Sequence, residues 1–203
     1  PDATMAKYGS SNVVIENNYL NHVGGDAITT MYLDRPLIQY NVSENASEQI
    51  NFKDYSKNQP SLDANGNVNG TQGVGAGRVA AGIWPWKCKN ALFRFNEAVD
   101  TKLNQDGMAY DADSGDGTVY ESNYSRQNEG GCVMFCLQEA IHNTFRNNVS
   151  FDDLGGTISP AENPDALIKD NTFYVRKGVP FVRKNMDGGN YTLENNQIVD
   201  LEN

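Results

Sequence analysis

The sequence has 203 residues, 38% of them apolar, which is enough for one domain with a continuous core. Its 26 acidic residues outnumber 16 basic ones, and the net charge of −10 argues against nucleic acid or an anionic membrane as the main partner. No apolar run approaches the ~20 residues of a membrane span, and the opening PDATMAKYGS has no signal-peptide pattern. A neutral or polar ligand fits this composition better.

An asparagine recurs along the chain at one position of a strand-length segment, from VVIENNYL near the start to TLENNQIV near the end. Successive asparagines are 23, 55, 27, 25, 23 and 25 residues apart. The residue three positions before each one is large and apolar or aromatic, so a strand is expected to enter a turn there. The asparagines are Asn18, Asn41, Asn96, Asn123, Asn148, Asn171 and Asn196.

A second set of strand-length runs begins with glycine or a small or acidic residue: GGDAITTMY, AGIWPWKC, DGMAYDAD, GGCVMFCL and GGTISPAE. No helical period of useful length is present, and the leucine spacing of a leucine-rich repeat is absent. Repeats of about 25 residues with one asparagine per repeat predict an all-β fold, a right-handed parallel β-helix of seven to eight coils spaced ~4.8 Å apart. We expect a single domain over residues 1–203, with the asparagines in an inward ladder.

The N-terminal sequence begins without Met and no polar cap is evident at either end. We therefore expect a longer β-helix that continues beyond one or both ends, through a further domain or chain. The interval of 55 between Asn41 and Asn96 holds about thirty extra residues rich in Asn, Gly, Ser and Asp. These predict a loop insertion at about 47–80, and long loops of this kind are often functional.

Alignment of the glycine-led strands predicts which side chains face the core. Because side chains alternate along a strand, one set should face in and the other out. Lys87, Met134 and Cys136 fall in the predicted inward set. The predicted outward set includes Trp84, Trp86, Asp111, Asp113, Val133 and Phe135. Aromatic rings beside carboxylates on one face indicate a sugar-binding groove.

Two carboxylates are the minimum apparatus for glycoside hydrolysis, and Asp111 and Asp113 are spaced as residues i and i+2 of one strand, nearly 7 Å apart. Asp106 is a third catalytic candidate. Trp84 and Trp86 are the candidate sugar platforms, and nearby turns supply four polar candidates for sugar hydroxyls, Gln105, Gln127, Asn128 and Glu129. The simpler interpretation also stands, in which the aspartates shape turns and the tryptophans fill the core.

The sequence gives little indication of a metal site or a disulfide bond. Three cysteines cannot all pair, and with only two histidines no zinc spacing appears, so buried free thiols are expected. DADSGDG resembles the start of an EF-hand calcium series, but the flanking helices and the final Glu are missing. We expect no cofactor, with calcium left as an alternative.

The string DGMAYDAD followed by TVYESNYSRQNEGG, together with GIWPWK, resembles glycoside hydrolase family 136, the lacto-N-biosidases, from about Gly82 to Gly156. In that family two aspartates seven positions apart release lacto-N-biose from milk oligosaccharides with retention. Only Asp106 and Asp113 have that separation here, so the resemblance implies Asp106 as acid/base and Asp113 as nucleophile. It also implies an extracellular or cell-surface bacterial enzyme with an oligosaccharide substrate.

The family pair conflicts with simple strand geometry. Seven extended residues span more than ~20 Å, too far for one glycosidic bond, so the chain must bend between the two aspartates, with Gly107 as the candidate hinge. Two alternatives also remain. A polysaccharide lyase needs acidic residues that hold calcium and an outward Lys or Arg, and Lys87 is predicted inward. A non-catalytic glycan-binding β-helix, such as an adhesin or tailspike shaft, needs neither feature.

Overall fold

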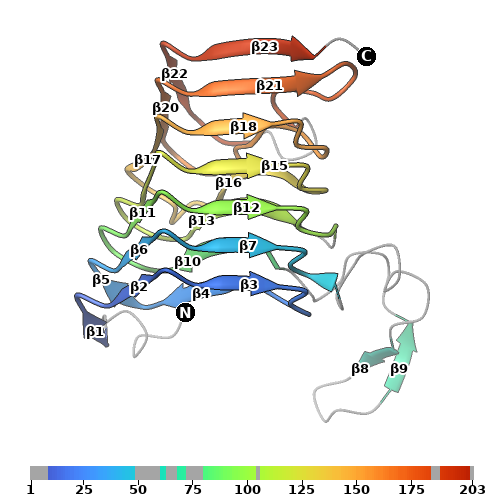
Figure 1. Cartoon of the computed structure of the whole chain (residues 1–203). Coiled ribbons are helices and arrows are strands. Elements are labelled where there is room, and N and C mark those ends of the chain that lie inside the picture. Colours follow the sequence, from blue (N-terminus) through green and yellow to red (C-terminus); the bar gives the residue numbers. More distant parts are fainter. Residues whose placement is uncertain are drawn as a thin grey trace.

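A computed structural model describes residues 9–48, 60–62, 68–71, 80–103, 106–183 and 188–201. The described chain is an all-β parallel solenoid whose coils stack on one another (Figure 1). The predicted β-helix is confirmed, with about six turns rather than seven to eight. Among the described residues, one of the three main sheets has five strands and the other two have seven. No helix in this described part is long and apolar enough to span a membrane.

Two seven-stranded sheets hold the asparagine segments. The first contains, in spatial order, β2 (Val14–Glu16), β6 (Leu37–Gln39), β11 (Leu92–Arg94), β14 (Val119–Glu121), β17 (Asn143–Arg146), β20 (Ala166–Lys169) and β22 (Thr192–Glu194). The second contains β3 (Tyr19–Asn21), β7 (Val42–Glu44), β12 (Glu97–Val99), β15 (Tyr124–Arg126), β18 (Val149–Phe151), β21 (Thr172–Arg176) and β23 (Gln197–Leu201).

The third sheet, called the site sheet below, is built from the glycine-led runs. Its strands are β4 (Ile28–Met31), β10 (Ile83–Trp86), β13 (Met108–Asp113), β16 (Gly131–Cys136) and β19 (Ile158–Ser159). Two short pairs complete the list of described strands: β1 (Ser10–Ser11) with β5 (Leu33–Asp34), and the antiparallel β8 (Pro60–Leu62) with β9 (Val68–Thr71). The expected insertion at about 47–80 contains the β8–β9 pair, which projects from the stack in Figure 1, and residues 49–59, 63–67 and 72–79 lie outside the described residues.

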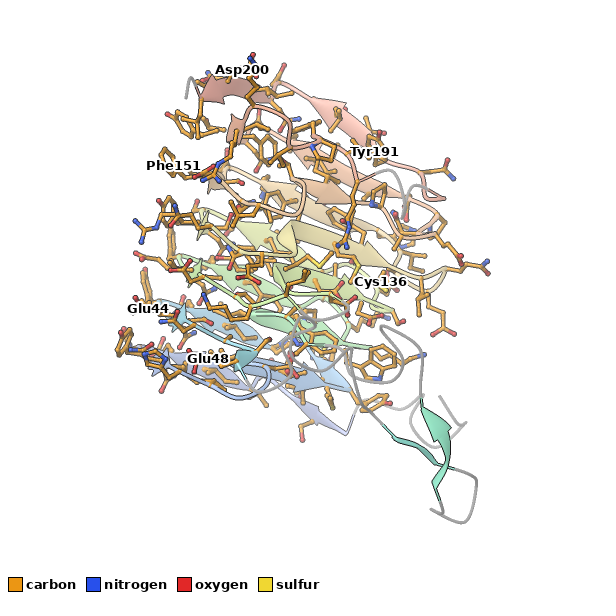
Figure 2. All side chains as sticks on the ribbon, turned by 90° about the vertical axis from the view of Figure 1, so that its right-hand side faces the viewer. Glu44, Glu48, Cys136, Phe151, Tyr191 and Asp200 are labelled. Carbon is orange, nitrogen blue, oxygen red and sulfur yellow. The ribbon has the colours of Figure 1, made fainter. Side chains whose placement is uncertain are left out.

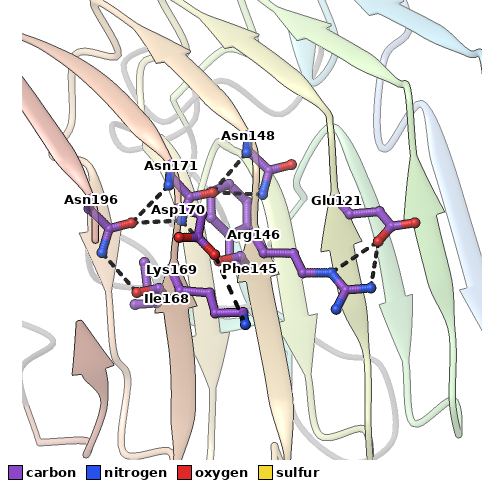
Figure 3. Close-up of polar contacts among 9 residues, drawn as sticks. All are labelled: Glu121, Phe145, Arg146, Asn148, Ile168, Lys169, Asp170, Asn171 and Asn196. Atoms are coloured by element: carbon purple, nitrogen blue, oxygen red, sulfur yellow. Dashed lines mark hydrogen bonds and ion pairs between the residues drawn. The ribbon is translucent and has the colours of Figure 1, made fainter. Parts of the chain in front are cut away.

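The asparagine ladder is confirmed. The Asn123 side chain donates from Nδ2 to Asn148 Oδ1 at 3.0 Å, and its backbone N–H donates to the same oxygen at 2.8 Å. Figure 3 shows the same pattern between Asn148, Asn171 and Asn196. Each asparagine side-chain oxygen thus accepts hydrogen bonds from both the backbone N–H and the side-chain amide of the neighbouring asparagine. Buried polar groups require such partners.

The residues three positions before the ladder form the core beside it. Phe93, Tyr120, Phe145 and Ile168 are fully buried, as the sequence pattern predicts. The Phe93 and Tyr120 rings pack with centroids 4.8 Å apart, about one coil spacing. The core column therefore fixes the register of the first sheet, because a slip of one residue would turn these side chains outward.

A second ladder was not predicted from the sequence. The Asn128 side chain is fully buried, accepts the backbone N–H of Thr101, and donates to the carbonyl of Ala98 and to Asp153 Oδ1. Asp153 also accepts hydrogen bonds from two serine hydroxyls. This ladder supports the turns that lead into the site sheet.

Candidate active site

The outward face of the site sheet carries the residues singled out by the sequence. Ile83 pairs with both Ile28 and Tyr110, and these buried side chains form the inner column. Trp86 pairs with Asp113 on the next coil. Trp84, Trp86, Asp111 and Asp113 therefore share the outer face on adjacent coils, as predicted.

The predicted register of β16 was wrong by one residue. Tyr110 pairs with Val133 and Ala112 with Phe135, so Val133 and Phe135 are buried in the core rather than turned outward. Met134 pairs with Asp111 and Cys136 with Asp113. The sequence alignment assumed a repeat of 24 residues at this step where the structure has 23, and a slip of one exchanges the two faces of a strand.

Strand β13 is bent, which reduces the conflict over Asp106 and Asp113. Ala109 and Tyr110 both lie in the main core cluster, although they are consecutive residues that a straight strand would point to opposite faces. Gly107, just before, has a φ of 73°, a conformation suited to glycine. The path from Asp106 to Asp113 is therefore shorter than that of an extended chain.

Asp111 and Asp113 lie together with Cys136 of the neighbouring coil. One potential ligand atom from each of the three side chains lies within 4.8 Å of the others. Asp111 is 2% exposed and Asp113 is 8% exposed. Ser114 donates its hydroxyl to Asp113 Oδ1 at 2.8 Å, whereas the buried Asp111 Oδ1 accepts no hydrogen bond from the described residues. This is the only group of three or more possible metal-ligating residues in the described part of the chain.

Burial makes these carboxyl groups hold protons more tightly than usual. It is the main reason that the pKa of Asp113 rises to about 7, with the Ser114 hydrogen bond opposing the rise and the Asp106 charge adding to it. Burial, reinforced by Asp113 and then Asp106, raises the pKa of Asp111 well above its ordinary value. Burial also raises the pKa of Asp106 to about 6, against the attraction of Arg183. The three aspartates are called the acidic cluster below, because their charges interact.

The two tryptophans have different environments. Trp84 is 7% exposed and donates its indole N–H to Asp26 at 2.8 Å, so it supports the site from below. Trp86 is partly exposed, packs edge to face on Trp84, and donates its indole N–H to the Tyr32 hydroxyl at 3.0 Å. Only Trp86 presents a ring to a ligand.

Trp86 lines a cavity of ≈370 Å³ next to Asp113, together with Lys87, Ser114, Leu137, Gln138, Glu139 and Glu162. Lys87 was predicted to face inward, and this prediction was wrong. Its φ of 48° turns the chain at the end of β10, and its ammonium pairs with Glu139 and lies 5.4 Å from the centre of a Trp86 ring. The cavity therefore combines an aromatic wall with charges of both signs, and its lining includes Ser114, whose hydroxyl donates to Asp113.

Three of the four polar turn candidates lie in the described part of the chain, and none of these three lines the cavity. Asn128 is fully buried in the second ladder, so its amide has no group left for a sugar. Glu129 accepts the backbone N–H of Leu103, and Gln127 lies 3.5 Å from Asp152. These three precede β16, at the Asp106 end of the site sheet, where a Cβ on Gly130 would meet the Asp106 carbonyl. Gln105 lies outside the described residues.

Two charged residues of the site were missed by the sequence reasoning. Asp26 accepts the backbone N–H of Ala81 and the Trp84 indole N–H, and its charge raises the pKa of Asp106 and Asp111. Arg183 is partly buried and lowers the pKa of Asp106. Asp26 could have been found from the sequence, because it is the acidic residue at the start of a glycine-led strand. Arg183 lies beyond the last strand of the site sheet, and no repeat in the sequence marks it.

The EF-hand resemblance of DADSGDG does not correspond to a converging set of ligands. Asp116 lies in the turn after β13, on a different coil from Cys136. Its carboxylate bonds the His142 ring at 2.9 Å. Of the aspartates in that string, only Asp111 and Asp113 fall in the group with Cys136.

Comparisons with known proteins agree with this site and fold. No protein-family model matches the chain. The chain is 44% identical over 207 residues to a lacto-N-biosidase of Bifidobacterium longum subsp. longum, covering all of this chain and 12% of that protein. Native and selenomethionine crystal structures of the GH136 lacto-N-biosidase from Eubacterium ramulus match with TM-scores of 0.81 and 0.80. Identity is 54% in both, over 93% of this chain and 28% of theirs.

The chain thus spans a small part of the relatives that it matches, but it matches that part along nearly its whole length in both sequence and fold. The resemblance to glycoside hydrolase family 136 is confirmed: this chain is similar in sequence and fold to a portion of the GH136 lacto-N-biosidase of Eubacterium ramulus.

Proposed function

We propose that this chain carries the catalytic face of a retaining glycoside hydrolase that releases lacto-N-biose from milk-type oligosaccharides. The observation that carries the proposal is the acidic cluster beside the Trp86 cavity, on a chain 54% identical to a GH136 lacto-N-biosidase. A buried carboxyl group with a raised pKa serves as a general acid near neutral pH, and a second carboxylate serves as nucleophile.

Access to the substrate distinguishes the three aspartates. Asp106 is partly exposed, Asp113 is 8% exposed, and Asp111 is 2% exposed. A group that protonates a leaving oxygen or attacks a sugar must reach it. We therefore assign Asp106 as acid/base and Asp113 as nucleophile, the order implied by the family resemblance.

Asp111 has a different role in this scheme. Burial raises its pKa well above the ordinary value and so favours its neutral form, which adds no second negative charge beside the nucleophile. With a pKa of about 6 at Asp106 and about 7 at Asp113, the form with Asp106 protonated and Asp113 ionised is the less populated of the two singly protonated forms, and this minor form is the one that reacts. One ionised and one protonated carboxyl group are what the first, glycosylation step requires.

In the first step, Asp113 attacks the anomeric carbon while Asp106 gives its proton to the leaving oxygen, and a glycosyl ester forms on Asp113. In the second step, Asp106 takes a proton from water, which attacks the ester and frees Asp113. The sugar keeps its anomeric configuration because it is inverted twice. Trp86 packs on the apolar face of a pyranose ring and holds the substrate during both steps.

The test uses the complete protein with lacto-N-tetraose and, separately, an acidic pectic polymer. We expect a disaccharide from lacto-N-tetraose whose newly formed hemiacetal first appears in the β-configuration, as followed by NMR. An α-product would contradict the retaining mechanism. An ultraviolet-absorbing product from the pectic polymer alone would indicate a lyase, and binding of glycans without any product would indicate a glycan-binding β-helix.

A further inference from the structure

The acidic cluster has a neighbour that glycoside hydrolysis does not use. The Cys136 thiol lies at the end of β16, in register with Asp113 on the preceding coil. Figure 2 labels this residue part of the way up the stack, between the coils of Glu48 and Asp200. Its Sγ belongs to the set of ligand atoms from Asp111, Asp113 and Cys136 that lie within 4.8 Å of one another. The thiol is free and partly exposed.

An independent observation indicates that this group lacks a ligand. Asp111 is 2% exposed, and its Oδ1 is buried without a hydrogen-bond donor among the described residues. Nearly all buried carboxylate oxygens in proteins have a donor or a cation beside them, because an unpaired one costs free energy. This oxygen is carried by one of the three side chains that converge.

The chemistry of the three donors narrows the choice of cation. Two carboxylate oxygens and one thiolate suit a thiophilic ion with four ligands, whereas Ca²⁺ takes about 6 to 8 oxygen ligands and Mg²⁺ about 6. Zinc binds oxygen at about 2.0 to 2.2 Å and sulfur at about 2.3 Å, so its ligand atoms lie roughly 3.5 Å apart. Movements of the three ligand atoms by about 1 Å would bring them close enough to bind one ion.

We propose that Asp111, Asp113 and Cys136 form a binding site for a thiophilic divalent cation such as Zn²⁺ or Cd²⁺. The thiol, and each of the two carboxyl groups that carries a proton, releases that proton to solvent as the bonds to the metal form, and the fourth ligand position is open to water. The bound ion holds the Asp113 oxygen that the substrate needs, so it inhibits hydrolysis. Binding itself is independent of the proposed function, whereas inhibition depends on it.

Binding is tested by titrating Cd²⁺ into the complete protein after treatment with a chelator and a reductant. We expect a thiolate-to-cadmium charge-transfer band in the ultraviolet that saturates with one Cd²⁺ for this site. Cys136→Ser should lose the band and bind Cd²⁺ at least tenfold more weakly, and Asp111→Asn should weaken binding by a similar factor. Ca²⁺ at the same concentration should not displace the Cd²⁺.

Cys88→Ser is the matched control, because Cys88 is a fully buried thiol 3.4 Å from the carbonyl of Thr30, which a serine hydroxyl can also bond. It should keep the band. The proposal is overturned if wild type shows no band, if Cys136→Ser keeps it with unchanged affinity, or if Cys88→Ser is the variant that loses it.

Inhibition is measured as the ratio of hydrolysis with and without Zn²⁺ for each variant. Wild type and Cys88→Ser should be inhibited and should recover with chelator, and Cys136→Ser should resist at least tenfold more Zn²⁺. Absence of hydrolysis in metal-free wild type, with the cadmium band intact, would remove the proposed function and leave the metal site. Normal hydrolysis without any cadmium band would do the reverse.

Discussion

The asparagine ladder and the acidic cluster are both columns of buried polar side chains in one β-helix, but they differ in how their polar groups are satisfied. In the ladder, each interior amide donates to the next asparagine and to a backbone carbonyl, and accepts in turn. In the acidic cluster, burial raises the pKa values of all three carboxyl groups, neighbouring carboxylates raise them further, and one oxygen has no donor among the described residues. Satisfied columns stabilise a fold, and unsatisfied ones are typical of functional sites.

The largest effect is expected when a carboxyl group of the acidic cluster is replaced by a neutral amide. Asp113→Asn and Asp106→Asn should each lower kcat by about 10³-fold or more, because each removes a reacting group without changing the shape of the site. Hydrolysis of lacto-N-tetraose by the complete protein is the measurement. Asp116→Asn, which changes a turn aspartate bonded to His142, is the matched control and should keep near-normal activity.

The complementary change is in the ladder. Asn123→Ala should destabilise its coils by about 3 kcal/mol, because it leaves the backbone N–H of Asn96 and the carbonyl of Phe93 without their partner. Hydrogen exchange of peptides covering β11 to β17 would report the loss. Asn18→Ala, at the exposed end of the same ladder, should cost less than about 1 kcal/mol. Equal protection from hydrogen exchange in both variants would contradict the view that the buried asparagines of the ladder contribute more to stability than the exposed one.

The cluster should make the protein less stable as the pH rises. Folded Asp113 keeps its proton up to about pH 7, while the unfolded chain releases it near 3.8, so the folded state binds more protons in between. Its contribution is therefore fully present below about pH 4 and is lost as pH rises through about 7. The shift corresponds to an upper bound on the order of 4 kcal/mol, reduced by coupling to the other carboxyl groups.

Hydrogen exchange of β13 and β16, corrected for the intrinsic pH dependence, would measure this change between pH 4.5 and 8. Asp113→Asn should flatten the profile and raise protection at pH 8, whereas Asp116→Asn should follow wild type. A wild-type profile that rises with pH would mean that the cluster is compensated by groups outside the described residues.

The smallest expected effect concerns the aromatic wall. Trp86→Ala should raise KM about tenfold with a smaller change in kcat, since it removes a stacking surface and not a reacting group. Trp86→Phe should recover most of the loss, which separates ring stacking from the hydrogen bond to Tyr32. Equal losses in both variants would assign the effect to that hydrogen bond instead.

Most of the architecture could be read from the sequence because a solenoid repeats its constraints. The asparagine at intervals of 23 to 27 residues marks the same turn in each coil, and the apolar residue three positions earlier marks the core. These signals are local in sequence, and stacking only multiplies them. The outward position of Trp84, Trp86, Asp111 and Asp113 followed from the same periodicity.

The tertiary structure alone decided the register of β16 and the partners of the acidic cluster. A one-residue change in repeat length moved Val133 and Phe135 into the core and brought Cys136 beside Asp113, and the composition of β16 leaves either choice open. The bend at Ala109 and Tyr110 likewise has no local signature beyond Gly107.

The coil, its ladder and the face on which the aspartates lie could thus be predicted from the sequence, because they depend on periodicity along the chain. The charges that meet on that face could not, because they come from separate coils. Asp26 and Arg183 reach Asp106 from coils distant in the sequence, and their effect on its pKa depends on burial and distance, which no repeat encodes.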